Sequence, residues 1–324
     1  MSIKKNSAPC NKKASNEVKA VMEYLKNISG KGIITGQHTQ NKVQKELKYI
    51  EEITGKQPAI CGFELLSYSP NINYENSSEE CLTEVKENKD TLENAWDWAL
   101  NKRGLITFTW HWFSPLGGSD KSFYSKNTTF DASQAIISGT DENIALLSDM
   151  DYMAGLLKGF SDKHIPILWR PFHEAEGEWF WWGSKGYEVA RKLYRIMYDR
   201  YTNYHKLNNL IWVWNSPLRD GYVGDDVVDV ITRDLYPEKH QHTDFKKEYE
   251  ELIKITPAKK LTALGEVGII PSISELSKSK TPWAWYMTWS NEFAASDVWT
   301  SKEELHKLYN SPYAITLDKL PRLY

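Results

Sequence analysis

The stretch Ile165-Pro166-Ile167-Leu168-Trp169-Arg170-Pro171-Phe172-His173-Glu174 ends a short apolar run with cationic side chains and a carboxylate. Four aromatic residues follow at 179–182 (Trp-Phe-Trp-Trp), with Gly183 directly after them. A short apolar run bounded in this way is consistent with a buried strand. Tryptophan beside charged residues and glycine is more typical of a cleft wall than of a sealed core. The alternative is a core strand with a capping ion pair, whose Trp residues only fill space.

Short apolar runs alternate with helical periods along the whole chain. Candidate strands cover residues 32–35, 59–63, 105–110, 165–169, 210–214, 230–234, 261–264 and 284–289. The period between them predicts helices at 16–28, 42–53, 88–103, 142–160, 187–204, 244–255, 272–278 and 302–308. Eight alternating strands are typical of a (β/α)₈ TIM barrel, which takes roughly 250 residues. We therefore predict an α/β protein with one (β/α)₈ domain spanning residues 1–324, its barrel at about 16–311 after an N-terminal tail, 1–15.

A doubly wound sheet would also alternate, but it usually has a Gly-rich phosphate turn after its first strand, which Thr35-Gly36-Gln37-His38 lacks. A barrel collects its functional side chains just after each strand, at the carboxyl-terminal mouth. Polar groups and indoles do stand at these points: Gln37, His38, Glu64, His111, Trp112, His173, Glu174, Asn215, Asp234, Tyr236, Glu266, Trp289 and Asn291. Any one of them could cap a helix, but their recurrence at all eight strand ends favours a functional mouth.

Two carboxylates, Glu174 after the fourth strand and Glu266 after the seventh, are the candidate reactive groups. A closed barrel places these strand ends across one mouth, where the carboxyl groups could approach to about 5–5.5 Å, the separation used for retaining glycoside cleavage. Sugar rings also present apolar C–H faces that lie on indoles. The alternative is that each glutamate makes a structural ion pair, for instance Glu266 with Arg170.

The segment Trp-Arg-Pro-Phe-His-Glu at 169–174, followed by Trp-Phe-Trp-Trp-Gly at 179–183, resembles the acid/base segment of glycoside hydrolase family 26. Further segments fit in order: Gly36-Gln37, Trp110-His111, Trp212-Val213-Trp214, Asp234-Leu235-Tyr236, Gly265-Glu266-Val267-Gly268 and Trp289-Ser290-Asn291. The resemblance covers roughly residues 32–291. It implies a (β/α)₈ barrel that cleaves with retention, most often as an endo-β-1,4-mannanase acting on mannan-type polysaccharides.

Site roles follow from the resemblance, residue by residue. It implies that Glu174 is the acid/base and Glu266 the nucleophile. The remaining positions are expected to bind substrate or to orient the glutamates: His111, His173, Trp179, Tyr236, Trp289, Arg170, Trp112 and Asp234. No cofactor and no metal are expected.

Composition narrows the partners. With 40 basic and 43 acidic residues the net charge is −3, which gives no attraction to nucleic acid or to anionic membranes. No apolar run is long enough to span a bilayer. The polar segment 1–15 contains no signal peptide, so the extracellular location expected for a polysaccharide hydrolase would require a leader that is not present in this sequence. We expect a monomer, and the spacing of Cys10, Cys61 and Cys81 leaves their disulfide state open.

Three alternatives remain at this level. Family 26 also includes β-1,3-1,4-glucanases and β-xylanases, and the stretches 68–83 and 113–140 are expected to shape the cleft that selects the sugar. A metal-dependent hydrolase would place His38, His111, His173 and Glu174 at the same mouth, but no His-x-His or His-Glu-x-x-His spacing is present. A sugar-binding barrel without catalysis would bind mannan and release no products.

Overall fold

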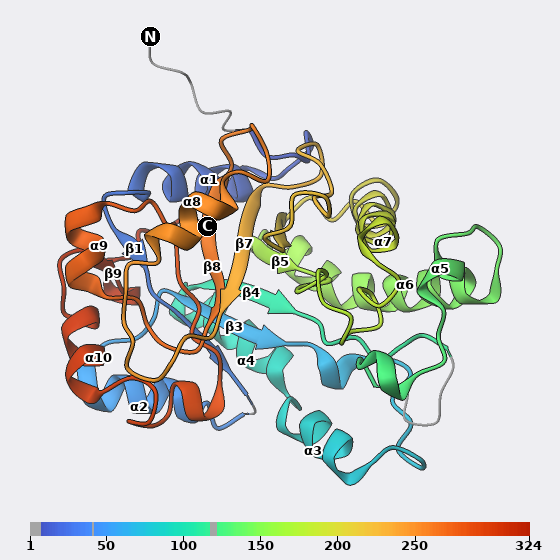
Figure 1. Ribbon diagram of the computed structural model, residues 1–324, viewed down its shortest axis with the longest axis horizontal. Helices are drawn as coiled ribbons and strands as arrows, with labels where there is room; N and C mark the ends of the chain where they lie inside the picture. The colour runs from blue at the N-terminus through green and yellow to red at the C-terminus, as the bar shows by residue number, and fades with distance from the viewer. Residues whose placement is uncertain (1–7, 41, 117–121) are drawn as a thin grey trace.

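The structure is a computed structural model that describes residues 8–40, 42–116 and 122–324. Seven parallel strands form one curled sheet in the order β2-β3-β4-β5-β6-β7-β8 (Figure 1). Their bounds are β2 Gly36–Thr39, β3 Ile60–Glu64, β4 Leu105–Thr109, β5 Ile167–Arg170, β6 Leu210–Asn215, β7 Val230–Leu235 and β8 Leu261–Val267. β1 (Ile33–Ile34) directly precedes β2 and pairs with β9 (Ala314–Ile315) in a separate parallel pair.

Residues 284–289 close the sheet into a barrel. This segment pairs only through isolated bridges, yet it hydrogen-bonds to both edges of the sheet. On one side the His38 amide donates to the Thr288 carbonyl at 2.9 Å, and on the other the Trp289 amide donates to the Val267 carbonyl at 3.1 Å. The predicted eighth strand is therefore present as an irregular closing segment, and the predicted (β/α)₈ barrel is confirmed.

Ten α-helices are described, and they surround the barrel (Figure 1). Their bounds are α1 Asn16–Ile28, α2 Lys45–Thr54, α3 Glu79–Glu87, α4 Thr91–Asp97, α5 Ala132–Ala135, α6 Asp141–Asp162, α7 Tyr187–Asp199, α8 Lys246–Leu252, α9 Ile273–Ser279 and α10 Lys302–Tyr309. π-helical turns, Trp98–Lys102 and Arg200–Tyr204, extend α4 and α7. α3 begins inside the stretch 68–83 and continues to residue 87. No helix was predicted there.

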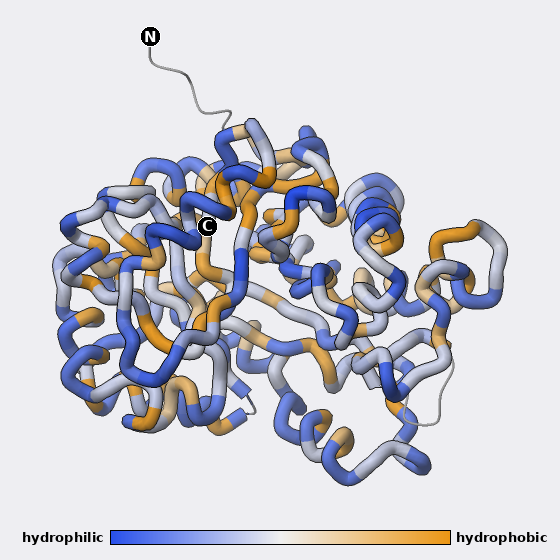
Figure 2. The backbone as a smooth tube through the Cα atoms, viewed as in Figure 1, coloured by the Kyte–Doolittle hydropathy of each residue, from blue (hydrophilic) through white to orange (hydrophobic). Residues whose placement is uncertain are grey.

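The core has two layers because alternate residues of a strand point to opposite faces. Outward-facing strand residues such as Phe63 and Phe108 pack under the surrounding helices. Inward-facing residues such as Ile60, Leu105 and Leu168 form a second cluster with α1. Figure 2 shows hydrophobic residues along the strands and hydrophilic ones on the outer turns of the helices. These inward residues stand at the amino-terminal halves of their strands, so α1 fills that end and polar residues occupy the other.

The ends of the chain correct the predicted boundaries. The Cys10 amide donates to Asp229 Oδ1 at 2.6 Å, and Ala14 is buried, so residues 8–15 pack on the barrel instead of forming a tail. The segment 1–7 lies outside the described residues. At the other end β9 and the Tyr324 hydroxyl, which donates to the Gly104 carbonyl at 2.5 Å, extend the packed domain beyond residue 311.

No disulfide joins any two of Cys10, Cys61 and Cys81 in the described part of the chain, so the disulfide left open by the sequence is not formed. Among the helices described, none has the length and apolar character needed to cross a membrane.

Candidate active site

Glu174 and Glu266 face each other at the carboxyl-terminal mouth of the barrel. Glu266 lies within β8, while Glu174 follows β5 by four residues. One carboxylate oxygen of each, together with one from Asp234 on β7, lie within 4.8 Å of one another. Retaining glycosidases place their carboxyl groups about 5–5.5 Å apart, and inverting ones leave roughly 6.5–9.5 Å for a water molecule. The observed spacing fits the retaining arrangement.

Glu266 is held by a donor on each oxygen. Arg170 pairs with Oε1, and the Tyr236 hydroxyl donates to Oε2 at 2.6 Å. Burial would lower the pKa of Arg170, but the charges of Asp234 and Glu266 hold it above its ordinary value. The ion pair between Arg170 and Glu266, considered above as a purely structural alternative, is therefore present. It is compatible with a reactive carboxylate, because it holds one oxygen of Glu266 in a fixed position.

The environment of Glu174 favours its protonated form. Burial raises its pKa, and the charge of Glu266 raises it further. Trp179 Nε1 donates to Glu174 Oε2 at 2.9 Å. The backbone of Glu174 is left-handed, with φ of 52°, a conformation that costs free energy for a residue with a side chain and clusters at functional sites.

Asn215, at the end of β6, links the two glutamates through a chain of hydrogen bonds. Its Oδ1 accepts from the Glu174 amide at 2.8 Å, and its Nδ2 donates to Asp234 Oδ1 at 2.7 Å. Asp234 Oδ2 in turn accepts from Arg170 at 3.0 Å. A register shift between Arg233 and Asp234 brings Asp234 opposite Glu266. One network therefore fixes the backbone of Glu174 and the carboxylate of Glu266 together.

A second network runs through the histidines. Glu64, at the end of β3, accepts from the His111 amide at 2.7 Å and contacts His111 Nδ1 at 2.8 Å. His111 Nε2 lies 3.0 Å from His173 Nε2. Burial alone would raise the pKa of Glu64, but the neighbouring His111 holds it at about 2. For His111, burial acts to lower the pKa and Glu64 more than offsets it, whereas burial and His111 lower that of His173.

Beside these groups lies a pocket of about 250 Å³, named here the cleft. Trp289 and His111 line it on the barrel side, and Tyr124 closes it from the loop after β4. The Trp289 ring packs on the buried His38 ring with centroids 4.4 Å apart. Glu84 and Asn88 face the cleft from α3 and the turn that follows. Carboxylates, imidazoles and flat rings at one concave site suit an uncharged, hydroxyl-rich ligand such as a sugar chain.

Comparison with known proteins decides the family. The sequence pattern of Glycosyl hydrolase family 26 matches residues 10–319. The chain belongs to glycosyl hydrolase family 26. The match includes every element of the barrel and both glutamates.

Two relatives with similar sequences are mannan endo-1,4-β-mannosidases. A mannan endo-1,4-β-mannosidase of Thermothelomyces thermophilus is 36% identical over 96% of this chain and 62% of its own length. Mannan endo-1,4-β-mannosidase A of Piromyces sp is 32% identical over 99% of this chain and 52% of its own. The chain therefore spans about half to three-fifths of the length of these relatives.

Solved structures of family 26 agree in fold. The GH26-CBM35 β-(1,4)-mannanase of Podospora anserina superposes with a TM-score of 0.88 at 34% identity, over 98% of this chain and 70% of that one. A β-mannanase from a symbiotic protist of the termite Reticulitermes speratus, solved with a gluco-manno-oligosaccharide, gives 0.87 at 31% identity over 99% of both chains.

One site prediction needs correction in this family 26 chain. Trp112 was expected to contact substrate, but only 1% of it is exposed. Its ring stacks on Trp110 at 4.1 Å, and its Nε1 donates to Asp149 at 2.8 Å. Trp112 is therefore buried beneath the barrel mouth, where it supports the residues above it. Trp179 keeps 48% exposure and Trp289 lines the cleft, so both are free to meet a sugar ring.

Glu64 and Asn215 had been noted at strand ends without a role. Glu64 and His111 end neighbouring strands, since Glu64 pairs in register with Thr109, and Asn215 ends the strand beside Glu174. A carboxylate and an imidazole at the ends of two adjacent strands are the signal that would have identified the contact between Glu64 and His111. The acidic residues of α3 were missed entirely, because the helix itself was.

Glu174, Asp234 and Glu266 have the spacing of a metal site, but their surroundings do not suit one. The Arg170 guanidinium already pairs with both Asp234 and Glu266 at 3% exposure. A metal cation there would be held against a buried, fixed positive charge. The histidines considered above as metal ligands do not belong to this group of three carboxylates. His111 contacts Glu64, and His111 and His173 contact each other.

Glu64→Gln is expected to remove a component of stability that depends on pH. The folded-state pKa of Glu64 is depressed from 4.5 to about 2, so its ionised form contributes stability above pH 4.5 that is lost as the pH falls toward 2. The shift corresponds to about 3 kcal/mol. Urea unfolding at pH 7 and at pH 3 measures it: wild type should lose more stability than the variant between the two. Equal losses would mean that Glu64 is not ionised beside His111.

Proposed function

We propose that this protein is an endo-acting β-1,4-mannanase that cleaves mannan-type polysaccharides with retention of anomeric configuration. The observation that carries the proposal is the approach of the Glu174 and Glu266 carboxylates to within 4.8 Å, beside a cleft that aromatic rings line. Family membership supports glycoside hydrolysis. The names of the relatives, mannan endo-1,4-β-mannosidases and β-mannanases, support mannan as the substrate.

The first step forms a bond between a Glu266 oxygen and the anomeric carbon. As that bond forms, the bond from the anomeric carbon to the leaving oxygen breaks, and Glu174 gives its proton to that oxygen. The positive charge that develops on the sugar lies next to the Glu266 carboxylate, which Arg170 and Tyr236 hold in position. The raised pKa of Glu174 lets it hold a proton for the leaving oxygen at higher pH than an ordinary carboxyl group would.

The second step returns the enzyme to its starting state. Glu174, now ionised, takes a proton from water, and the resulting hydroxide oxygen bonds to the anomeric carbon while the bond to Glu266 breaks. Each step inverts the anomeric carbon, so the product keeps the configuration of the substrate. In this proposal His111, which lines the cleft, contacts the sugar at the cleavage point, and the buried His173 holds the His111 ring in place. Trp289 and Trp179 support the neighbouring rings.

Incubation with mannan, lichenan and xylan, read by chromatography, tests the substrate. We expect oligosaccharides of several lengths from mannan at early times, because an open cleft binds the chain internally, and much slower release from the other two. A preference for lichenan or xylan would transfer the proposal to a glucanase or a xylanase of the same family. Binding without product over hours would indicate a sugar-binding barrel, and loss of activity on chelation would indicate a metal enzyme.

We also propose that the protein acts outside the cell and as a monomer. The location follows from the size of the polysaccharide, which is too large to import intact. The monomer follows from the site, because both glutamates and the donors that hold them belong to one chain. Immunodetection in culture medium against cell extract tests the first, and light scattering after size-exclusion chromatography tests the second.

A further inference from the structure

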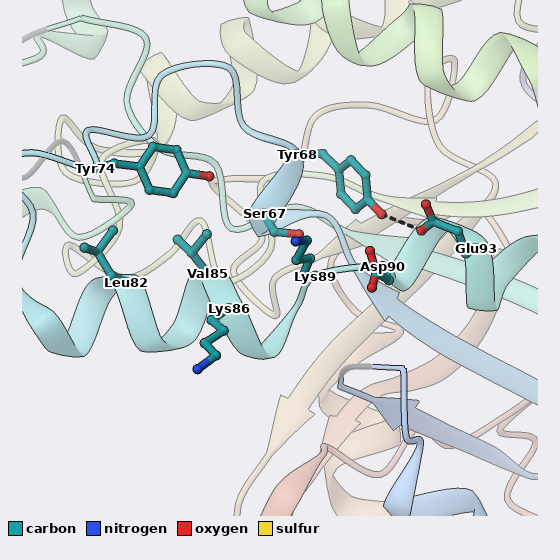
Figure 3. Close-up of a pocket in the computed structure, with 9 residues that line it drawn as sticks. All are labelled: Ser67, Tyr68, Tyr74, Leu82, Val85, Lys86, Lys89, Asp90 and Glu93. Carbon is teal, nitrogen blue, oxygen red and sulfur yellow. Dashed lines mark hydrogen bonds between the residues drawn. The ribbon is translucent and has the colours of Figure 1, made fainter.

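On the opposite side of α3 from the cleft lies a second hollow, of about 430 Å³, named here the tyrosine pocket (Figure 3). Tyr68 and Tyr74 stand on either side of Ser67, and Leu82 and Val85 point from α3 toward Tyr74 (Figure 3). Lys89, Asp90 and Glu93 complete the polar part of its wall. No step of the proposed mechanism uses these residues.

The two tyrosines differ in a way that suits binding. The Tyr68 hydroxyl donates to Glu93 at 3.0 Å and accepts from the Leu92 amide at 3.1 Å, so its ring is fixed. Tyr74 is 65% exposed, and its hydroxyl has no hydrogen-bond partner among the described residues. A large aromatic ring left open to solvent beside a hollow is typical of a recognition surface.

The polar groups of the pocket are also available. Within the described part of the chain, the Lys89 ammonium and the Asp90 carboxylate form no ion pair with any other side chain. An ammonium donates and a carboxylate accepts hydrogen bonds, and the hydroxyls of a sugar can satisfy both. The apolar floor of Leu82 and Val85 suits the C–H face of the ring. The opposite charges of Lys89 and Asp90 favour a neutral ligand over a polyanion.

α3 lies between the tyrosine pocket and the cleft and contributes side chains to both. Leu82 and Val85 face the pocket, while Glu84 and Asn88 line the cleft. The preceding turn divides in the same way, with Leu66 in the cleft and Ser67 in the pocket. A helix is about 10 Å across, so a chain of several sugars can occupy the cleft and reach the pocket around it.

We propose that the tyrosine pocket is a second, non-catalytic binding site for a neutral β-linked hexose chain, which retains the polysaccharide beside the cleft. The inference rests on the proposed function, since it takes its ligand class from the polymer cleaved at Glu174 and Glu266. The stretch 68–83, which the sequence analysis expected to shape the cleft, contributes Tyr68, Tyr74 and Leu82 to this second site.

The test compares Tyr74→Ala and Lys89→Ala with a matched control, Tyr152→Ala, which removes a 49% exposed tyrosine from α6. Tyr74→Ala should raise KM for soluble galactomannan by roughly 3- to 10-fold with unchanged kcat, from the loss of one ring contact. Hydrolysis of a short manno-oligosaccharide, which fills the cleft alone, should not change. Lys89→Ala should act in the same direction.

Binding is measured separately in a Glu266→Gln background, by retardation in native gels that contain galactomannan. Adding Tyr74→Ala should weaken retardation, and adding Tyr152→Ala should not. Unchanged retardation and KM in both pocket variants, or an equal effect of the control, would overturn the inference. If wild type instead cleaves and is retarded by lichenan or xylan, the proposed mannanase function fails, and the same variants on that polymer decide the site.

Discussion

Replacing Glu266 by alanine is expected to lower kcat on mannan by about 10⁴-fold or more. The variant removes the oxygen that would bond to the anomeric carbon, so the covalent step has no nucleophile. Arg170 keeps its ion pair with Asp234 at 3.0 Å, so the fold around the site should persist. Steady-state rates on mannan and on activated aryl glycosides measure the loss, which should be equally severe on both substrates.

Two controls separate chemistry from folding. Glu266→Gln preserves the shape of the side chain and should be as inactive as alanine, since an amide does not form the glycosyl bond. Circular dichroism and binding to mannan should match wild type. Turnover within 10-fold of wild type in either variant would remove Glu266 from the mechanism.

Replacing Glu174 by alanine is expected to give a loss that depends on the leaving group. On mannan, whose leaving hydroxyl needs a proton, the rate should fall by about 10²- to 10⁴-fold. On aryl glycosides with good leaving groups the first step needs no acid, so the glycosyl-enzyme should form quickly and then accumulate. A burst of released phenol followed by slow turnover is the expected trace, and added azide should accelerate the slow phase by replacing water.

The pH profile gives an independent reading of Glu174. Its raised pKa keeps the acid protonated, so the rate on mannan should fall as the pH rises through that pKa. Glu174→Gln has no carboxyl group to ionise, so its residual rate on mannan should lack this alkaline fall. Equal losses on every leaving group, with the alkaline fall retained, would contradict the assignment of acid and nucleophile.

The barrel was predictable because its helices and strands keep regular periods. The first predicted helix, 16–28, has the same bounds as α1, where Val18, Val21, Met22 and Leu25 recur on the buried face. α3 escaped detection because its stretch is mostly polar. Ser78 caps it by accepting from the Cys81 amide, and that N-cap followed by two glutamates is a signal that sequence alone contains.

Strand periodicity could not fix where each strand ends. Gln37 and His38 were expected beyond the first strand, yet they lie within β2, where Gln37 Nε2 donates to three carbonyls including that of Trp289 at 3.1 Å. Whether a tryptophan at a strand end is exposed or buried also depends on packing between segments that are distant in the sequence. Trp112 is covered by Trp181 at 5.2 Å, a contact that no local pattern predicts.

The two glutamates were found because polar residues recur where parallel strands end. Their spacing of less than 4.8 Å was not accessible from sequence, because it depends on closure of the barrel by residues 284–289 and on the register shift beside Asp234. The ion pair of Glu266 with Arg170 was foreseen only as an alternative to function. In the structure it belongs to the same network as Asn215 and Glu174.

Proton NMR of the first product released from a β-1,4-manno-oligosaccharide tests the whole account most directly. Two carboxylates this close leave no room for a water molecule between nucleophile and sugar. The new reducing end should therefore appear as the β anomer and convert to α only later, by mutarotation. An α anomer appearing first would mean that water attacks directly, and that Glu174 and Glu266 do not act on one glycosidic bond in the way their geometry indicates.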